Sequence, residues 1–172
     1  MILSDYAKGV ITQELIDFLS PLAAQHKVLL AVDPKPSRKL NYSGVGLMTP
    51  NRHEALELAG IPEPHHDEPY PLEQVCQRIH EQFSPRLLVV TLGADGMAIS
   101  QNGAIAQTLP TEAREVFDVS GAGDTVIATL TAALATGADP VQAARTANRA
   151  AGIVVSKVGT VTVTPEEMLG ES

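Results

Sequence analysis

Two uninterrupted apolar runs constrain the fold of this chain more than any other feature of its sequence. Residues 28–32 read Val-Leu-Leu-Ala-Val, and residues 87–90 read Leu-Leu-Val-Val. Neither run alternates apolar with polar residues, which is the pattern of a strand buried on both faces of a parallel sheet. The chain is therefore expected to build a sheet that is covered by helices on both sides.

Helix-forming segments separate the strand candidates in the order that such a fold requires. Strands are expected at residues 1–3, 27–32, 44–48, 87–92 and 116–119, and in a hairpin of residues 97–99 and 104–109. Helices are expected at residues 12–26, 51–58, 72–83, 121–136 and 139–155, and from residue 164 onward. The 121–136 helix is expected to be deeply buried because residues 126–134 carry no charge. We predict one doubly wound α/β domain over residues 1–172, with a mostly parallel sheet flanked by helices.

The composition excludes several classes of function. A formal net charge of −8 without a cluster of Lys and Arg argues against a nucleic-acid partner. Cys76 is the single cysteine, which excludes an internal disulfide and a cysteine-based zinc site. No apolar run is long enough to span a membrane, and no basic segment of the signal-peptide type opens the chain. These features favour a soluble cytoplasmic protein that binds neither membrane nor nucleic acid.

The strongest candidate for chemistry is the segment of residues 118–125, Asp-Val-Ser-Gly-Ala-Gly-Asp-Thr. Gly121 and Gly123 allow backbone amides to approach a ligand that a Cβ atom would block. The helix that begins here directs free N–H groups and the positive end of its dipole at one point, which suits a phosphate. Asp124, in the first helical turn, can accept a proton from an attacking hydroxyl. A glycine pair used only for packing, and an acid that only favours the helix start, are the plainer alternatives.

Two widespread glycine-rich phosphate motifs do not fit this segment. A dinucleotide-binding fingerprint needs a third glycine where the chain has Val126. A P-loop needs Gly-Lys-Ser or Gly-Lys-Thr, and no such sequence follows the glycines.

The whole segment resembles the second signature of the ribokinase-like (PfkB) carbohydrate kinases. The resemblance implies that the amides of Gly121, Ala122 and Gly123 form an anion hole for the transferring phosphoryl group. It also implies that Asp124 is the base that deprotonates the sugar hydroxyl, with ATP and Mg²⁺ as cofactors. Preorganised donors that meet the charge of a phosphoryl group are consistent with this assignment.

Two further motifs have their counterparts in the same family. Asn51-x-x-Glu54 resembles the Asn-x-x-Glu motif that positions magnesium through water, although the same pattern is a helix capping box. Thr91, Gly93 and Gly96 resemble the family's nucleotide-binding strand end, Thr-x-Gly-x-x-Gly. An ordinary exit from a strand into a turn explains these three residues equally well.

The resemblance assigns three more residues to the nucleotide. Asn148 and Gly152 fall where the family's last long helix lines the adenine, and small residues there also suit close helix packing. Lys35, at a predicted strand end, is placed to meet a phosphate of ATP or of the substrate. A solvated lysine is the alternative.

A monovalent cation, K⁺, is implied beside the anion hole. Asp118 and Ser120, with carbonyl groups near Val155 and Val158, match the positions where many relatives hold such a cation. The alternative is a plain loop.

Residues 3–9 (Leu-Ser-Asp-Tyr-Ala-Lys-Gly) and 150–163 are most similar to the family members that act on heptose 7-phosphate. The resemblance implies transfer of the γ-phosphoryl group of ATP to the anomeric oxygen, giving the 1,7-bisphosphate used for lipopolysaccharide core synthesis. The alternative is a non-catalytic nucleotide-binding or interaction module.

The resemblance covers only the carboxyl-terminal half of such a kinase domain. The amino-terminal half, with its Gly-Gly sugar motif and its lid, has no counterpart in these residues. We therefore expect the chain to form a homo-oligomer or to pair with a separate amino-terminal kinase half, through an exposed apolar edge of the sheet. A strictly monomeric elution profile at high concentration would contradict this expectation.

Overall fold

A single six-stranded sheet forms the centre of the computed structural model, which describes residues 1–65, 67–113 and 115–170. The strands lie in chain order across the sheet: β1 (Ile2–Ser4), β2 (Ala31–Asp33), β3 (Leu47–Met48), β4 (Leu87–Thr91), β5 (Met97–Gln101) and β6 (Ala104–Leu109). Strands β1 to β4 are parallel, whereas β5 and β6 form an antiparallel hairpin. The prediction of a mostly parallel α/β sheet is confirmed.

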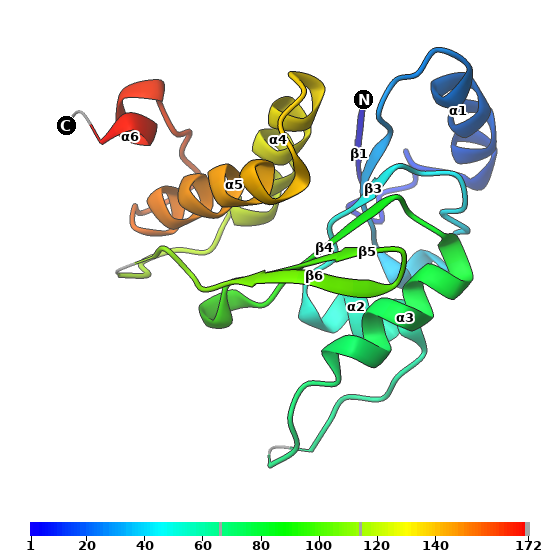
Figure 1. Ribbon diagram of the computed structural model, residues 1–172, viewed down its shortest axis with the longest axis horizontal. Coiled ribbons are helices and arrows are strands. Elements are labelled where there is room, and N and C mark those ends of the chain that lie inside the picture. Colours follow the sequence, from blue (N-terminus) through cyan, green and yellow to red (C-terminus); the bar gives the residue numbers. More distant parts are fainter. Residues whose placement is uncertain (66, 114, 171–172) are drawn as a thin grey trace.

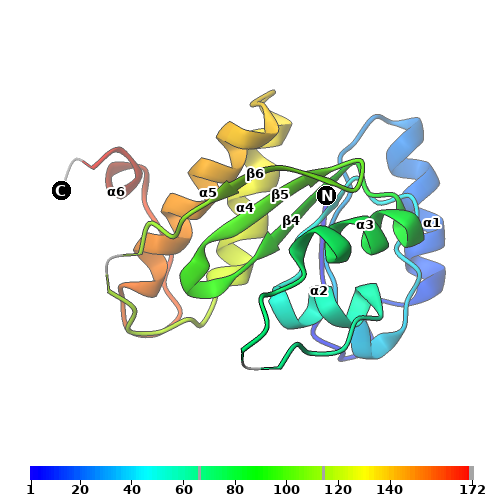
Figure 2. The same cartoon turned by 60° about the horizontal axis from the view of Figure 1, so that its bottom comes forward.

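Helices cover both faces of this sheet (Figures 1 and 2). One face carries α1 (Gln13–Gln25), α2 (Arg52–Ala59) and α3 (Leu72–Phe83). The other face carries α4 (Ala122–Ala135) and α5 (Pro140–Val155), and the short α6 (Pro165–Leu169) follows at the end of the chain. Within the described residues, no helix is both long and apolar enough to cross a membrane.

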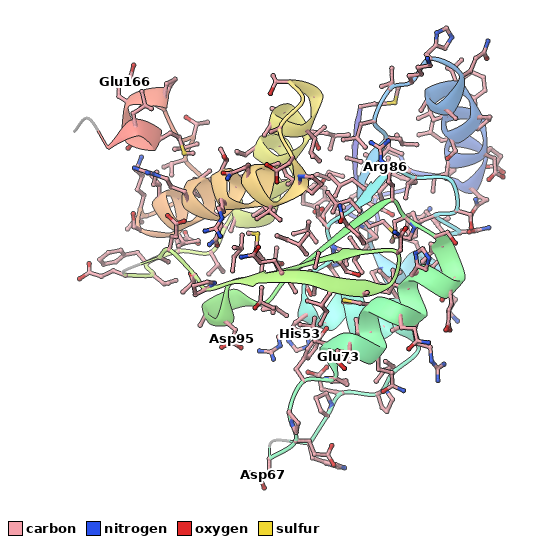
Figure 3. All side chains as sticks on the ribbon, in the orientation of Figure 1. His53, Asp67, Glu73, Arg86, Asp95 and Glu166 are labelled. Atoms are coloured by element: carbon pink, nitrogen blue, oxygen red, sulfur yellow. The ribbon has the colours of Figure 1, made fainter. Side chains whose placement is uncertain are left out.

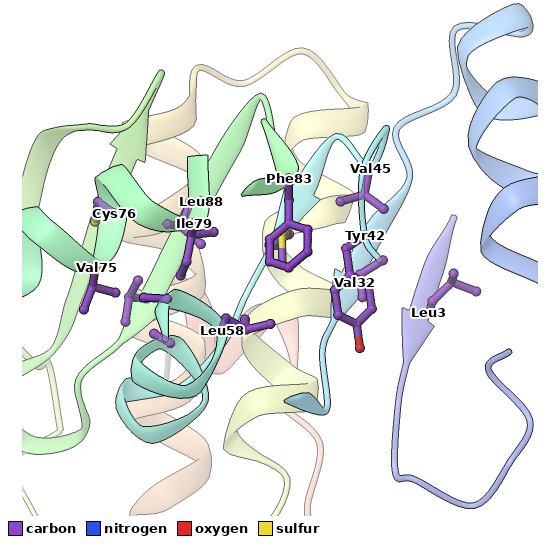
Figure 4. Packing of buried hydrophobic residues seen from close by; sticks show 14 of the residues in the cluster. Leu3, Val32, Tyr42, Val45, Leu58, Val75, Cys76, Ile79, Phe83 and Leu88 are labelled. Carbon is purple, nitrogen blue, oxygen red and sulfur yellow. The ribbon is translucent and has the colours of Figure 1, made fainter. Parts of the chain in front are cut away.

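The continuous apolar strands contribute side chains to two hydrophobic cores, one on each face of the sheet. Successive side chains of a strand point to opposite faces, so Leu88 packs under α2 and α3 while Val89 packs under α4 and α5. Figure 4 shows the first of these cores, where the rings of Tyr42 and Phe83 meet edge to face at 5.7 Å. The two-sided burial explains why these strands show no polar alternation.

The strand predicted at residues 116–119 is absent from the structure. Val116, Phe117 and Val119 are exposed and lie in a loop. The backbone N–H groups of Phe117 and Asp118 both donate to the carbonyl of Val155, at 2.8 and 3.3 Å. The β-forming side chains there meet no neighbouring strand, so their propensity alone does not produce a strand.

Helix α4 is buried on one face only, which corrects the expectation of complete burial. Val126, Ile127 and Leu130 face the sheet, whereas a stripe along the opposite side is exposed. That stripe consists of Gly123, Asp124, Ala128, Ala132 and Ala135. The small uncharged residues of this helix predicted burial from the sequence, although several of them lie on the protein surface.

Strand β2 is shorter than predicted because the chain leaves α1 through a tight turn. Lys27 adopts a φ of 55°, and the N–H of Val28 donates to the carbonyl of Ala23 at 2.9 Å. Val28 is 44% exposed and lies outside the sheet, and the residue pairs between β1 and β2 begin with Ile2 and Ala31.

Candidate functional site

The candidate site lies where the parallel strands end. Arg86 precedes β4 and Asp95 follows it, so these two labelled side chains mark the two ends of that strand (Figure 3). At the Asp95 end, the chain continues from β1, β2 and β3 into polar residues. A short backbone bridge between Asn51 and Thr91 joins the ends of β3 and β4. Carboxyl ends of parallel strands are where open α/β sheets bind ligands.

The turn at Gly121 starts α4 beside this edge. Gly121 has a φ of 78°, in the left-handed region that glycine adopts without strain, and it occupies the N-cap without a side-chain hydrogen bond. The amide of Ala122 donates to the carbonyl of Val119 at 3.2 Å. Gly123 and Asp124 follow in the first turn, where amides have no intrahelical acceptor. Gly123 is exposed, so its amide is accessible to an anionic ligand.

Two hydroxyl groups from the end of β1 meet the carboxylate of Asp124. The phenol of Tyr6 donates to Oδ2 at 2.6 Å, and the hydroxyl of Ser4 donates to Oδ1 at 3.3 Å. The motif that singled out Asp124 is local, whereas these partners lie about 120 positions earlier in the sequence. Neither Ser4 nor Tyr6 was predicted as a site residue.

Asp33 is a second carboxylate of this edge that the sequence analysis did not assign to the site. It ends β2, and a Cβ atom on Gly123 would lie 3.9 Å from its Oδ2. Burial, followed by the negative charges of Glu54 and Asp124, raises the pKa of Asp33 to about 7. The only signal in the sequence was an acidic residue at the end of a buried strand.

Asp5 adds a further buried carboxylate. It is 7% exposed, its Oδ1 accepts the N–H of Ala7 at 2.8 Å, and its Oδ2 has no hydrogen-bond partner within the part of the chain that the structure describes. A buried oxygen without a donor costs free energy. The site therefore concentrates negative charge that the ammonium of Lys35 only partly offsets.

Asn51 and Glu54 form the capping box of α2. The side chain of Asn51 accepts the amides of His53 and Glu54 at 3.0 Å, and Glu54 Oε2 accepts the amide of Asn51 at 3.0 Å. Glu54 Oε1 accepts the ammonium of Lys35 at 2.9 Å, which raises the pKa of Lys35. One carboxylate oxygen thus caps the helix while the other faces the site.

A cleft of about 500 Å³ opens beside the start of α4. Five of the six residues predicted to bind nucleotide line it: Thr91, Gly93, Gly96, Asn148 and Gly152. Ala122, Gly123 and several apolar residues complete its wall, which suits a flat apolar ring at one end and an anion at the other. Lys35 is not among the residues that line this cleft. The role of these residues in nucleotide binding stays a prediction.

Close backbone packing explains why two of the residues that line the cleft are glycines. A Cβ atom on Gly96 would lie 2.0 Å from the carbonyl oxygen of Leu109. A Cβ atom on Gly152 would lie 3.0 Å from the amide nitrogen of Ala113. Gly93, in contrast, has no atom within 4 Å of that position, so it leaves space open beside the cleft. Asn148 is buried, and its amide donates to the carbonyl of Pro110 at 2.7 Å.

The predicted cation ligands lie near one another, but several of their oxygen atoms already accept hydrogen bonds. Asp118 Oδ1 accepts the amide of Ser120 at 2.8 Å, and Oδ2 accepts the amide of Gly159 at 3.1 Å. These bonds lower the pKa of Asp118. The carbonyl of Val155 already accepts two amides, and Val158 is 81% exposed. The monovalent cation stays a prediction.

No group of three or more His, Cys, Asp or Glu side chains is arranged to hold a metal ion by itself, as far as the described residues show. A divalent cation at this edge would therefore need ligands from a phosphate or from water in addition to protein carboxylates.

Asp33→Asn is expected to flatten the pH dependence of stability in buffer without divalent cations. Between the ordinary pKa of 3.8 and the raised value of about 7, the folded chain holds more proton at Asp33 than the unfolded chain does. The contribution of Asp33 to the free energy of unfolding therefore falls as pH rises through that window. Urea unfolding at about pH 4 and about pH 8 checks this. Exposed Asp17 provides the control variant Asp17→Asn, and equal pH dependence in wild type and Asp33→Asn would contradict the prediction.

Comparison with known proteins identifies the class to which this fold and site belong. Residues 3–167 match the model of the pfkB family of carbohydrate kinases, and the chain belongs to that family. It is 43% identical over 172 residues to the bifunctional protein HldE of Pelobacter propionicus, and 44% identical over 168 residues to that of Halorhodospira halophila. Each match covers 98% of this chain but 34% of the relative, so the chain spans about a third of the length of these curated proteins.

Solved structures agree on the fold. Ribokinase of Arabidopsis thaliana, complexed with ribose and ATP, superposes with a TM-score of 0.80 at 20% identity, over 98% of this chain and 54% of that one. Phosphofructokinase-2 of Escherichia coli, in complex with potassium, gives a TM-score of 0.81 at 18% identity, also over 98% and 54%. The ribokinase-like fold is thereby confirmed.

Proposed function

We propose that this chain supplies the nucleotide-binding and phosphoryl-transfer part of an ATP-dependent carbohydrate kinase. The observation that carries the proposal is the position of the Gly121–Asp124 turn between the 500 Å³ cleft and the carboxylates at the strand ends. A nucleotide in that cleft has its phosphates directed at a helix start, with a carboxylate next to it. Membership of the carbohydrate kinase family supports the same assignment.

In the proposed reaction, an acceptor hydroxyl attacks the γ-phosphorus of ATP. The new O–P bond forms as the bond to the bridging oxygen of ADP breaks, and the hydroxyl proton passes to the carboxylate of Asp124. First-turn amides at Gly123 and Asp124 donate to the phosphoryl oxygens, where negative charge must be stabilised. These donors are held in place by the helix, so they need no reorganisation during the transfer. The amide of Ala122, which the resemblance assigned to the anion hole with those of Gly121 and Gly123, donates to the carbonyl of Val119.

The carboxylates of this edge fit a bound magnesium ion. Half-buried Asp33, with its raised pKa, and Glu54 both contribute oxygen atoms to a region of excess negative charge. Oxygen ligands of this kind are those that Mg²⁺ prefers, together with water and phosphate. When bound, the ion would neutralise part of the phosphate charge. Asn51 would act through the capping box that holds Glu54 in place.

We propose heptose 7-phosphate as the acceptor, on the strength of the similarity of residues 3–9 and 150–163 to the kinases that use it. The identity of 43–44% to bifunctional HldE proteins over nearly the whole chain supports this choice. The second candidate is a nucleotide-binding module without turnover. The observation behind it is the exposed edge of β1, where Met1 and Ile2 are 46% and 40% exposed, because such a sheet edge is available to an interaction partner.

Ala151→Leu tests the nucleotide part of this proposal. Ala151 is half-buried and lines the cleft, so a larger side chain there is expected to weaken binding of ATP and Mg²⁺ at least about tenfold. Calorimetric titration measures the affinity. Ala132→Leu, at an exposed position of α4, is the matched control and should bind as wild type does. Equal affinity in all three proteins would place the nucleotide elsewhere.

Release of ADP in the presence of heptose 7-phosphate separates the two candidate functions. Turnover that depends on the sugar supports the kinase. Binding of ATP without sugar-dependent turnover supports the module and contradicts catalysis by the chain alone.

A further inference from the structure

The end of β1 presents two hydroxyl groups to Asp124 on one side of the strand. Ser4 and Tyr6 are two positions apart, so in extended backbone they point to the same face. The backbone N–H of Asp5 donates to the carbonyl of Asp33 at 3.1 Å, which continues the β1–β2 pairing by one residue beyond Ser4. Asp5 itself points to the opposite face, where it is buried.

The turn that carries Tyr6 is anchored, although its ring is not. Asp5 is 7% exposed and accepts the amide of Ala7, which has a φ of 55°. The side chain of Tyr6 is 63% exposed, and its hydroxyl donates to Asp124. An exposed aromatic ring that gains little from packing is oriented here by a fixed backbone and one hydrogen bond.

The two contacts with Asp124 differ in strength. A phenol–carboxylate distance of 2.6 Å lies in the range of short charge-assisted hydrogen bonds, whereas 3.3 Å from Ser4 to Oδ1 is long for a hydroxyl donor. The bond to Asp124 raises the pKa of Tyr6, so the phenol keeps its proton and remains a donor near neutral pH. Oδ2 is therefore firmly engaged, while Oδ1 is held loosely.

We propose that Tyr6 is a positioning residue that holds Asp124 by Oδ2 and so leaves Oδ1 as the oxygen that accepts the proton of the acceptor hydroxyl. This inference rests on the proposed function for the identity of the reaction, but the arrangement itself does not depend on turnover. The hydrogen bond from Ser4 to Oδ1 breaks when the acceptor hydroxyl binds, because it is the longer of the two contacts. The position of a base relative to the attacking oxygen strongly affects rate.

The rotamer of Asp124 provides a test that needs no activity. Three-bond couplings in NMR spectra of the full chain report whether the side chain occupies one χ1 rotamer or an average. We expect one rotamer in wild type, averaging in Tyr6→Phe, and one rotamer in Ser4→Ala, which removes the other hydroxyl from the same strand end. A single rotamer in Tyr6→Phe overturns the proposal. Equal averaging in both variants overturns the assignment of distinct roles to the two oxygens.

Kinetics with ATP and heptose 7-phosphate provide the second readout. Tyr6→Phe is expected to lower kcat about 10- to 100-fold with an unchanged KM for ATP, because only the placement of the base is lost. A lower KM for the sugar with an undiminished kcat would show instead that the phenol blocks the acceptor site, and would overturn positioning. If wild type shows no turnover with this sugar, the proposed reaction fails, and the rotamer measurement alone decides the role of Tyr6.

Discussion

Asp124→Asn is expected to lower the sugar-dependent release of ADP by at least about 10³-fold while changing the affinity for ATP by no more than about twofold. Asparagine keeps the shape of the side chain, and its amide oxygen can accept one of the two hydroxyls while its NH₂ group donates to the oxygen of the other. It cannot take up a proton from the acceptor. The nucleotide cleft and the first-turn amides remain in place. A loss confined to kcat would identify the carboxylate as the proton acceptor.

The control for this experiment is Asp17→Asn, which makes the same chemical change on the exposed surface of α1. It should retain full activity and full nucleotide affinity. Turnover that survives Asp124→Asn would remove Asp124 from the role of base. A matching loss of ATP affinity in Asp124→Asn would indicate that the substitution disturbs the start of α4 and not the proton transfer alone.

Gly96→Ala is expected to destabilise the folded chain by about 4 kcal/mol or more, or to prevent folding. Gly96 has φ 88° and ψ −124°, a region open essentially to glycine, and its added Cβ atom would lie 2.0 Å from the carbonyl oxygen of Leu109. Backbone cannot yield as a flexible side chain does, so β6 must separate from the turn that follows β4.

Gly60→Ala is the control for a positive φ without a close contact. Gly60 also has a positive φ, 63°, at the end of α2, but no atom lies within 4 Å of the added Cβ position. That change should cost only about 1 kcal/mol, from the left-handed backbone. Urea unfolding compares the two variants. Similar losses of stability would show that backbone conformation, and not the close approach to Leu109, explains the requirement for glycine at position 96.

The glycine motif after β4 therefore combines two different requirements. In the sequence, Gly93 and Gly96 were assigned together to nucleotide binding by resemblance. In the structure, Gly93 leaves open space beside the cleft, whereas Gly96 allows the backbone after β6 to pass close by. Both residues line the cleft, so a functional variant at Gly93 is more informative about nucleotide binding than one at Gly96.

Local patterns predicted much of this fold. The capping box of Asn51 and Glu54 is formed as expected, and Thr12 and Asp139 cap the helices that were predicted to follow them. The hairpin predicted for residues 97–99 and 104–109 also forms, as strands β5 and β6. These features depend on contacts within a few residues of sequence, so the residues themselves contain the necessary information.

Predictions failed where the outcome depends on distant neighbours. Residues 116–119 have β-forming side chains but no neighbouring strand, and they lie in a loop that is bonded to Val155. The uncharged run of residues 126–134 in α4 indicates burial, although the helix packs on the sheet with one face and its opposite face is exposed. Propensity and periodicity describe what an element can bury, but not whether another element is there to cover it.

The sequence by itself determined the doubly wound class of the fold and the motif that contains Asp124, because both depend on short runs of residues. Only the tertiary structure decided which groups surround that carboxylate. It brings Ser4 and Tyr6 from the end of the first strand to its two oxygens. It also leaves Asp33 half-buried beside the like charges of Glu54 and Asp124, so the pKa of Asp33 rises to about 7. Parallel strands place residues that are far apart in the chain at one edge of the sheet, so these contacts follow from topology and not from any local pattern.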